Sequence, residues 1–380
     1  MPVSDLDRRR VWVLSGGRCL LCHDYLLTDD LEDLSEVRHI GEVAHIAGES
    51  TGGPRGESEV PEEERNDPSN LVLLCPNHHT SADKRRLTDP IYTEEFLLAR
   101  KREWEAFIKA ATGILPDHRT MVLRMVDTVK LNPAIVSISD VAKAVMGHSL
   151  RMPQYLGDLP AAGPDIDLNR VPETIDEQYW TASVAQIDAG IERFRLAMER
   201  NVLDHLSVFA IAHVPLLIAL GNRLDDAVPT DIFNKQRSSE SWTWDQRAQE
   251  VPFTFELADA DADEAVLMVN ASGSIFEHEL PEAVAGLPVF RIRPAEGHDP
   301  TTSSFDSAGT QAMFDATVRS FFAELELRAK HVRRLHVFAA VPVSAAVALG
   351  RRLPADVAAP YLALYHRTDN TYLYAFDIPR

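Results

Sequence analysis

An internal repeat is the feature that most constrains the fold of this chain. Residues 206–224, LSVFAIAHVPLLIALGNRL, align without gaps on residues 335–353, LHVFAAVPVSAAVALGRRL, and about half of the positions are identical. Each copy has the pattern of an apolar strand, a short turn and a helix rich in alanine and leucine. Continuous apolar strands that alternate with helices are typical of a mostly parallel sheet covered by helices. Two copies therefore predict two Rossmann-like halves packed as one pseudo-symmetric unit.

Ligands in such a sheet bind at the carboxyl ends of the strands, where the turns into the helices gather. The turns AHVP (212–215), NASGS (270–274) and AVPVS (340–344) leave backbone N–H groups near helix N-termini, where phosphate can bind. Flanking segments add cationic side chains, and SWTW and TYLYAF, each expected to be an alternating aromatic strand, add faces on which bases can stack. The candidate ligand-binding residues are His213, Pro215, Lys235, Arg237, Trp242, Trp244, Pro342, Ser344, His366, Arg367, Tyr372 and Tyr374. For each aromatic residue, a place in the core of the sheet is at least as good an alternative.

The three cysteines of the chain all lie at metal-ligand spacing. Cys19 and Cys22 form one closely spaced pair, and Cys75 and His78 form a second pair some fifty residues later. Three cysteines are too few for a disulfide framework, whereas two chelating pairs suit tetrahedral Zn²⁺. Because four protein ligands close the coordination shell, the zinc is expected to be structural. The alternative is three buried free cysteines and a surface histidine.

His79 directly follows the last zinc ligand and needs a separate explanation. Neighbouring residues on a helix point about 100° apart, so two consecutive imidazoles cannot serve one small site. Residues four apart share a face, which places His79 beside Asp83 and predicts a second metal site on the same short helix. The segment KRR (84–86) follows and could contact a DNA backbone, although a solvated charge run is an equal interpretation.

The order His45, Asn70, His79 around the zinc knuckle resembles the HNH endonucleases, which have a ββα-metal core. The resemblance covers roughly residues 18–85 and is carried by AHI, a GG loop, NLVLLCPNHH and the CxxC pair. Cleavage of a phosphodiester needs a base for water and a cation that stabilises developing charge. The resemblance implies that His45 is the base, that Asn70 orients it, and that His79 holds Mg²⁺ or Mn²⁺.

The catalytic metal shell departs from the family pattern. Many members place an Asp or His ligand directly before the base, and Ala44 stands at that position. Asp83 is the candidate second ligand, since a carboxylate suits a hard cation, with a plain surface carboxylate as the alternative. Glu42 or Asp67 could complete the shell.

The C-terminal part, about residues 130–380, resembles a SAVED domain, the two-fold CARF-like sensor of anti-phage CBASS systems. HVFAAVPVSAAVALGR and the later LALYHR carry the resemblance. An HNH domain followed by SAVED is the arrangement of a CBASS effector type. The resemblance implies that a cyclic di- or trinucleotide, made by a partner nucleotidyltransferase, binds SAVED and activates destruction of double-stranded DNA.

The charge of the chain is consistent with a latent enzyme. A net charge of −20 opposes DNA binding by a monomer, because phosphate contacts depend on Lys and Arg. Ligand-driven association would bring nuclease sites together and multiply weak contacts, so we expect a homo-oligomer on activation. No apolar run approaches the roughly 18–20 residues of a membrane helix, and the start lacks a signal peptide. A cytoplasmic protein without a membrane partner is therefore expected, and the resemblance to CBASS effectors implies a bacterial one.

The expected fold class is α/β. A small ββα-metal, treble-clef-like zinc-knuckle nuclease domain is expected at 1–112 and a linker at 113–135. A SAVED domain of two fused Rossmann-like halves is expected at 136–380, with its repeat near 206–244 and 335–376. Two alternatives stay open. One is a restriction-type HNH enzyme with a DNA-reading C-terminal half, which the repeat and the acidity disfavour. The other is a non-catalytic zinc module on a nucleotide sensor, which Ala44 keeps open.

Overall fold

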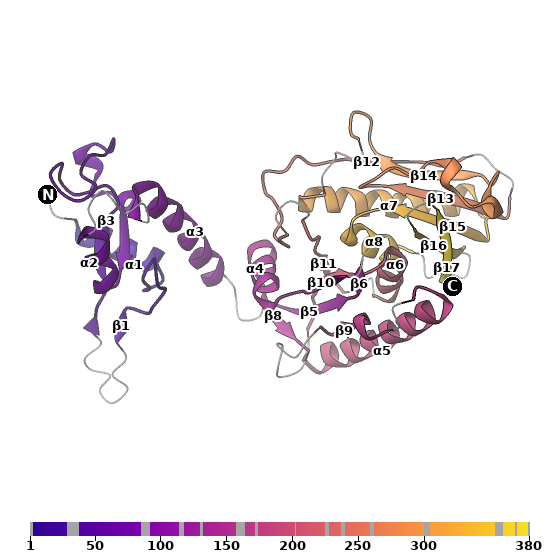
Figure 1. Ribbon diagram of the computed structural model, residues 1–380, viewed down its shortest axis with the longest axis horizontal. Helices are drawn as coiled ribbons and strands as arrows, with labels where there is room; N and C mark the ends of the chain where they lie inside the picture. Colours follow the sequence, from indigo (N-terminus) through magenta and orange to yellow (C-terminus); the bar gives the residue numbers. More distant parts are fainter. Residues whose placement is uncertain are drawn as a thin grey trace. The chain divides into compact units, whose positions relative to one another are not determined.

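The computed structural model divides the chain into two compact units, Met1–Leu115 and Pro116–Arg380, which are described separately (Figure 1). The described residues are 3–28, 38–84, 92–113, 118–129, 132–156, 164–171, 174–201, 203–224, 228–236, 240–258, 262–299, 305–353, 360–368 and 371–378.

The first unit is built around one antiparallel hairpin and the helix that follows it. Its elements are α1 (Asp5–Leu14), β1 (Leu27–Thr28), β2 (Arg38–His39), β3 (Glu42–His45), the 3₁₀ helices η1 (Glu62–Glu64) and η2 (Pro68–Asn70), β4 (Leu71–Leu74), α2 (Pro76–Lys84) and α3 (Glu94–Thr112). β3 pairs with β4, which is buried along its whole length, and α2 contacts both strands. The unit therefore contains the expected ββα arrangement. Side-chain caps start two of its helices: Ser4 accepts from the Asp7 N–H, and Thr93 accepts from the Phe96 N–H.

The second unit contains two sheets. The first half comprises β5 (Arg119–Val126), β6 (Thr128–Val129), β7 (Asn132–Pro133), α4 (Ile138–Ser149), β8 (Met152–Tyr155), β9 (Ile166–Asp167), η5 (Leu168–Arg170), α5 (Glu177–Asn201), β10 (Leu206–Ile211), α6 (Val214–Arg223) and β11 (Thr230–Ile232). The second half comprises β12 (Phe253–Glu256), β13 (Glu264–Asn270), η6 (Glu277–Glu279), η7 (Glu282–Val284), β14 (Val289–Pro294), α7 (Ala308–Arg328), β15 (Arg334–Ala340), α8 (Val343–Arg351), β16 (Tyr361–Arg367) and β17 (Tyr372–Ile378).

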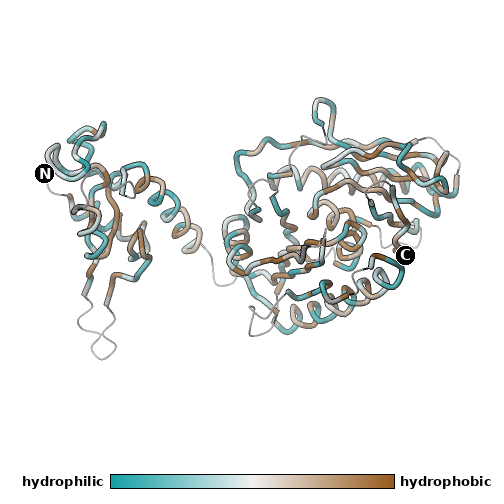
Figure 2. The backbone as a smooth tube through the Cα atoms, in the orientation of Figure 1, coloured by the Kyte–Doolittle hydropathy of each residue, from teal (hydrophilic) through white to brown (hydrophobic). Residues whose placement is uncertain are grey.

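Both sheets are mostly parallel, as the apolar strand–helix pattern predicts. The first has the order β11-β10-β5-β8, with β9 also pairing with β5, and all of these pairs are parallel. The second has the order β12-β14-β13-β15-β16-β17, and only the two edge pairs are antiparallel. Figure 2 shows the apolar character concentrated along the central strands, whereas α5 alternates between apolar and polar residues.

The two copies of the repeat form β10–α6 and β15–α8. α6 and α8 pack against each other, and each also contacts the sheet of the opposite half: α6 contacts β16 and β17, and α8 contacts β10 and β11. Residues 215–221 and 344–351 are accordingly all buried. A helix that is apolar on every side is expected in such a central position. The predicted pair of Rossmann-like halves is therefore confirmed.

Two predictions about local structure are wrong. The stretch 113–135, expected to be a linker, contains β5, whose residues from Thr120 are buried in the middle of the first sheet. Its apolar run is buried on both faces, which is the pattern of a central parallel strand. The segment SWTW (241–244) lies outside the named strands. None of the helices in the described part of the chain has the length and apolar character needed to span a bilayer.

Candidate functional site

Four side chains in the first unit meet at a point where a metal ion could bind. The ligand atoms of Cys19, Cys22, Cys75 and His78 all lie within 4.8 Å of one another. The Cys19 Sγ–His78 Nδ1 distance is 3.6 Å, and the Cys22 Sγ–Cys75 Sγ distance is 3.9 Å. In a tetrahedral zinc site, bond lengths place sulfur and nitrogen about 3.6 Å apart and two sulfurs about 3.8 Å apart. The donor set and its dimensions therefore fit zinc.

The cluster joins three parts of the unit. Cys19 and Cys22 lie in one turn. The Leu20 N–H of this turn donates a hydrogen bond to the Leu73 carbonyl of β4. Cys75 directly precedes α2, and His78 lies in the first turn of that helix. A zinc ion here would fix the start of α2 relative to the hairpin, which is the structural role expected of a closed site.

The two consecutive histidines of α2 have different partners, as helix geometry predicts. His78 Nδ1 is 3.2 Å from Cys75 Sγ in the cysteine cluster, whereas His79 Nδ1 is 2.7 Å from Glu42 Oε2 on β3. His79 is thereby placed beside the strand that ends at His45. Asp83 lies one turn further along α2, but its side chain is outside the described residues, as are Arg85 and Arg86. Asp67, the other carboxylate considered for the shell, is exposed at the start of η2.

His45 is held by an asparagine that sequence reasoning did not select. Its Nε2 lies 2.9 Å from Asn66 Oδ1. Asn70 is buried, and its amide binds the backbone: its Oδ1 accepts from the Ala47 N–H, and its Nδ2 donates to the carbonyls of Ala47 and Arg65. That Asn70 orients His45 stays a prediction, but the hydrogen bonds of Asn70 do not go to the ring itself. The amide of Asn70 instead fixes the backbone of the loop that follows His45.

Arg55 links the strand end that carries His45 to the helix that carries His79. Its Nη2 and Nε donate to the carbonyls of His45 and Ile46, and its Nη1 donates to the Ala82 carbonyl of α2 at 2.6 Å. Cations are favourable beside the terminal carbonyls of a helix. Arg55 follows the GG pair at 52–53 and Pro54, which was the only indication in the sequence that this loop carries a structural arginine. The pattern does not show which carbonyls Arg55 binds, because they lie between 9 and 27 positions away.

In the second unit, two of the predicted ligand-binding residues come together from opposite halves. His213 precedes α6 in the first half, and His366 lies near the end of β16 in the second. Their ring centroids are 4.7 Å apart and nearly perpendicular. Tyr179 and Trp180, from the first turn of α5, complete this group of rings. The group lies at the carboxyl ends of the strands, where the fold predicts a ligand site.

A buried carboxylate lies behind these rings. Tyr179 donates its hydroxyl proton to Asp127 Oδ2 at 2.5 Å, and the Thr128 N–H donates to Oδ1. Asp127 is 2% exposed and directly follows β5. Sequence reasoning missed Asp127. The residue directly follows an apolar strand, and the carboxyl ends of such strands are where ligands of parallel sheets bind, so the same argument that selected the other turns applies to it.

Burial keeps both imidazoles of this group neutral at pH 7. Burial, together with the smaller effect of the nearby His213, lowers the pKa of His366 to about 4. Burial also lowers the pKa of His213, while the Asp127 charge and a backbone hydrogen bond to Thr128 oppose that shift. Burial and Asp127 raise the pKa of Tyr179, so its hydroxyl remains a donor.

A cavity of about 420 Å³ adjoins the rings, between the start of α5 and strand β17. It is lined by Ile175, Asp176, Glu177, Trp180, Thr181, His366, Leu373, Tyr374, Ala375 and Phe376. Tyr374 is 51% exposed and so offers a ring face to a ligand. The aromatic lining and the volume suit one nucleotide of a larger ligand.

Several of the other predicted ligand-binding residues belong to the core. Trp242 and Trp244 pack with Phe209 and Phe233, and Tyr372 packs with Phe338. All three predicted aromatics are at most 9% exposed, so the prediction that they stack on bases is wrong. The core alternative holds for them because large rings bury the most apolar area.

The remaining predicted residues are distributed as follows. Pro215 is buried in α6 and Ser344 in α8, and Pro342 precedes α8. Lys235 is half-buried. Arg367 binds Glu279 at 3.0 Å and lies over the Tyr372 ring. Arg237 lies outside the described residues. Of the twelve predicted ligand-binding residues, His213, His366 and Tyr374 are those that the structure places at the cavity or the ring group.

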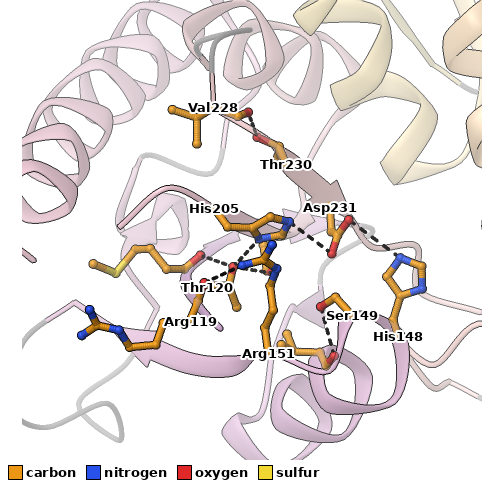
Figure 3. Close-up of polar contacts among 12 residues, drawn as sticks. Arg119, Thr120, His148, Ser149, Arg151, His205, Val228, Thr230 and Asp231 are labelled. Carbon is orange, nitrogen blue, oxygen red and sulfur yellow. Dashed lines mark hydrogen bonds and ion pairs between the residues drawn. The ribbon is translucent and has the colours of Figure 1, made fainter. Parts of the chain in front are cut away.

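A second polar cluster lies at the opposite, amino-terminal edge of the first sheet (Figure 3). His205 Nδ1 is 2.8 Å from Thr120 Oγ1, and its Nε2 is 3.6 Å from Asp231 Oδ2. His148 approaches the other carboxylate oxygen of Asp231 at 3.8 Å. These side chains join α4, β5, β11 and the residue before β10. Because ligands of such sheets bind at the other edge, we interpret the cluster as structural.

Comparison with known proteins finds two family models. The model for the SMODS-associated and fused to various effectors sensor domain, SAVED, matches residues 188–378, and an HNH endonuclease model matches residues 19–88. No curated protein matches the chain.

Solved structures include similar chains. One is an Acinetobacter baumannii Cap4 SAVED/CARF-domain containing receptor with the cyclic trinucleotide 3'3'3'-cAAA, at 14% identity and a TM-score of 0.42, with 75% of this chain and 55% of that chain covered. Another is a Moraxella osloensis Cap4 SAVED/CARF-domain containing receptor, at 12% identity and a TM-score of 0.41, with 80% and 63% covered. The chain thus spans little more than half the length of these receptors.

Proposed function

Because the chain belongs to the SAVED sensor family and carries an HNH endonuclease domain, we propose that it is a ligand-activated nuclease. In this proposal a cyclic oligonucleotide activates metal-dependent cleavage of double-stranded DNA, as a CBASS effector in the cytoplasm of bacteria under phage attack. The observation that carries the proposal is the divergence of His78 and His79 on α2. One imidazole faces the cysteine cluster, and the other faces β3, the strand that ends at His45.

The chemistry is assigned to the residues of the ββα core. His45 accepts a proton from the attacking water. His79 and Asp83 are proposed to hold a magnesium or manganese ion, which when bound would stabilise charge on the phosphate and the leaving oxygen. Asn70 and Arg55 keep the backbone of the His45 loop in place. The cysteine cluster would hold zinc, which would keep α2 against the hairpin.

The sensor chemistry is assigned to the carboxyl ends of the second unit. A base of the cyclic di- or trinucleotide enters the cavity at the start of α5 and stacks on Tyr374. The ligand then touches residues of both halves, because His213 belongs to the first half and His366 to the second. A ligand that contacts both halves can bias their arrangement and favour association of chains. Association would offset the weak DNA binding of an acidic monomer.

A panel experiment tests the proposed function. The purified full chain is incubated with plasmid DNA, Mg²⁺ and each of a set of cyclic di- and trinucleotides, and the DNA is followed on a gel. We expect degradation with one or a few of these ligands, and intact DNA without ligand or with His45→Ala. Cleavage at one specific sequence, or only of methylated DNA, would instead support a restriction-type enzyme. Unchanged cleavage by His45→Ala would refute the assigned mechanism.

A further inference from the structure

Each of the two imidazoles of the ββα core has a side-chain partner at one ring nitrogen, and the nitrogens differ. His79 is held at Nδ1 by Glu42 Oε2 at 2.7 Å, and His45 is held at Nε2 by Asn66 Oδ1 at 2.9 Å. Both distances are ordinary for hydrogen bonds between side chains. The two rings are therefore bound through different nitrogens, Nδ1 in His79 and Nε2 in His45.

The acceptors determine which ring nitrogen carries the proton. An ionised carboxylate only accepts hydrogen bonds, so Nδ1 of His79 carries a proton, and in the neutral ring the lone pair is on Nε2. A histidine that binds a metal usually donates its other N–H to such a carboxylate. The carbonyl oxygen of Asn66 likewise only accepts, so Nε2 of His45 carries the proton, and in the neutral ring the lone pair on Nδ1 can accept a proton from water.

We propose that Glu42 and Asn66 are positioning residues that hold His79 and His45 in opposite tautomers. One imidazole then presents Nε2 to a divalent cation and the other presents Nδ1 as a base. This inference rests on the proposed function. It also changes the role of Glu42, which orients a metal ligand at hydrogen-bonding distance and is not itself a ligand.

Burial explains why the carboxylate beside His79 comes from position 42 and not from position 44. Residues 42 and 44 lie on one face of β3, since side chains alternate along a strand. Ala44 is 2% exposed and belongs to the core of the unit, where a carboxylate would be buried. Glu42 has an exposed side chain one pleat earlier and reaches His79. The carboxylate that binds His79 therefore comes from the exposed first residue of β3.

Nitrogen NMR of the zinc-containing full chain, without added magnesium or manganese, tests the tautomers directly. Histidine ¹⁵N labelling reports which ring nitrogen is protonated, and His45→Ala and His79→Ala assign the two rings. We expect a protonated Nδ1 for His79 and a protonated Nε2 for His45. Glu42→Ala should change the spectrum of His79 alone, and Asn66→Ala that of His45 alone. Glu42→Gln keeps an acceptor oxygen and should restore the wild-type pattern, and Glu49→Gln, an exposed carboxylate outside this contact, serves as the control.

Binding of Mn²⁺ alone gives a second readout. Loss of an outer carboxylate typically costs about 10–100-fold in metal affinity, so Glu42→Ala should weaken Mn²⁺ binding by that factor and Asn66→Ala should not. Asn66→Ala should lower kcat with little change in KM. Unchanged ring spectra and Mn²⁺ affinity in Glu42→Ala, or an unchanged His45 spectrum in Asn66→Ala, would overturn the inference while leaving the proposed function intact. Cleavage that survives His45→Ala would overturn the proposed function and the catalytic meaning of both tautomers.

Discussion

Gly221 of α6 and Gly350 of α8 each lie against the backbone of the other helix. A Cβ atom on Gly221 would lie 2.0 Å from the Val347 carbonyl oxygen, and one on Gly350 would lie 1.9 Å from the Ile218 carbonyl oxygen. The two glycines occupy equivalent positions in the two copies of the repeat. The contact therefore follows the pseudo-symmetry of the unit and brings the two halves together at its centre.

Alanine at either glycine should destabilise the second unit. A helix interior normally favours alanine over glycine by about 1 kcal/mol, but here the added methyl group must push two backbones apart. We expect Gly221→Ala and Gly350→Ala each to lower the free energy of unfolding by roughly 1–3 kcal/mol, the usual cost of overpacking. Gly147 of α4 is the matched control, because its Cβ would have no neighbour within 4 Å. Urea unfolding should show Gly147→Ala at least as stable as wild type, and equal effects at all three positions would contradict the packing.

Removal of the metal from the cysteine cluster should unfold the first unit selectively. All four ligands lie between Cys19 and His78, within the unit that ends at Leu115. Structural zinc supplies folding free energy directly, so a chelator or Cys75→Ser should abolish both zinc binding and protection of β4 from hydrogen exchange. Protection in β10 and β15 should persist. Full protection of β4 in a zinc-free protein would show that the cluster is not structural.

Trp242 and Tyr374 should behave differently, although both were selected from aromatic segments. Trp242 is 1% exposed in the core, so Trp242→Ala should cost about 3–5 kcal/mol of stability. Tyr374 is half exposed at the cavity, and Tyr374→Ala should change stability little but weaken binding of the activating cyclic oligonucleotide. At about 1–3 kcal/mol per stacked base, the loss should be at least about fivefold by calorimetry. Normal ligand binding by Tyr374→Ala would exclude this cavity as the site.

Stability of the second unit should fall as the pH is lowered through the titration of the buried histidines. Burial lowers the pKa of His366 from 6.5 to about 4 and lowers that of His213 in the same direction. In the unfolded chain the histidines take up protons near pH 6.5, whereas in the folded chain His366 does so only near pH 4. Between these values protons bind preferentially to the unfolded chain. The free energy of unfolding is therefore highest above pH 6.5 and falls as the pH is lowered toward 4. His366→Gln should flatten this part of the stability profile, whereas His118→Gln, at an exposed position, should not. Parallel profiles for His366→Gln and wild type would contradict the burial effect.

The sequence predicts those features that depend on local spacing. The repeat predicts two parallel sheets, the two ligand pairs predict the cysteine cluster, and helix periodicity predicts the divergence of His78 and His79. Each of these needs only the period of a helix or strand, or the reach of a turn.

The features that sequence reasoning missed depend on contacts between distant segments. Asn66 reaches His45 across 21 positions, and Tyr179 reaches Asp127 across 52. The pattern of a single chain does not specify which loop returns to which strand. Burial of Trp242 is of the same kind, since it depends on Phe209 and Phe233 from other segments of the fold.

The central claim is that ligand binding to the second unit activates the nuclease of the first by associating chains. The most direct test measures plasmid cleavage and molar mass by light scattering on one preparation, before and after addition of the activating cyclic oligonucleotide, with Mg²⁺ present throughout. The account predicts a monomer-sized, nearly inactive protein before addition, and a joint rise in mass and cleavage afterwards. Rapid cleavage by the monomer without ligand would contradict it.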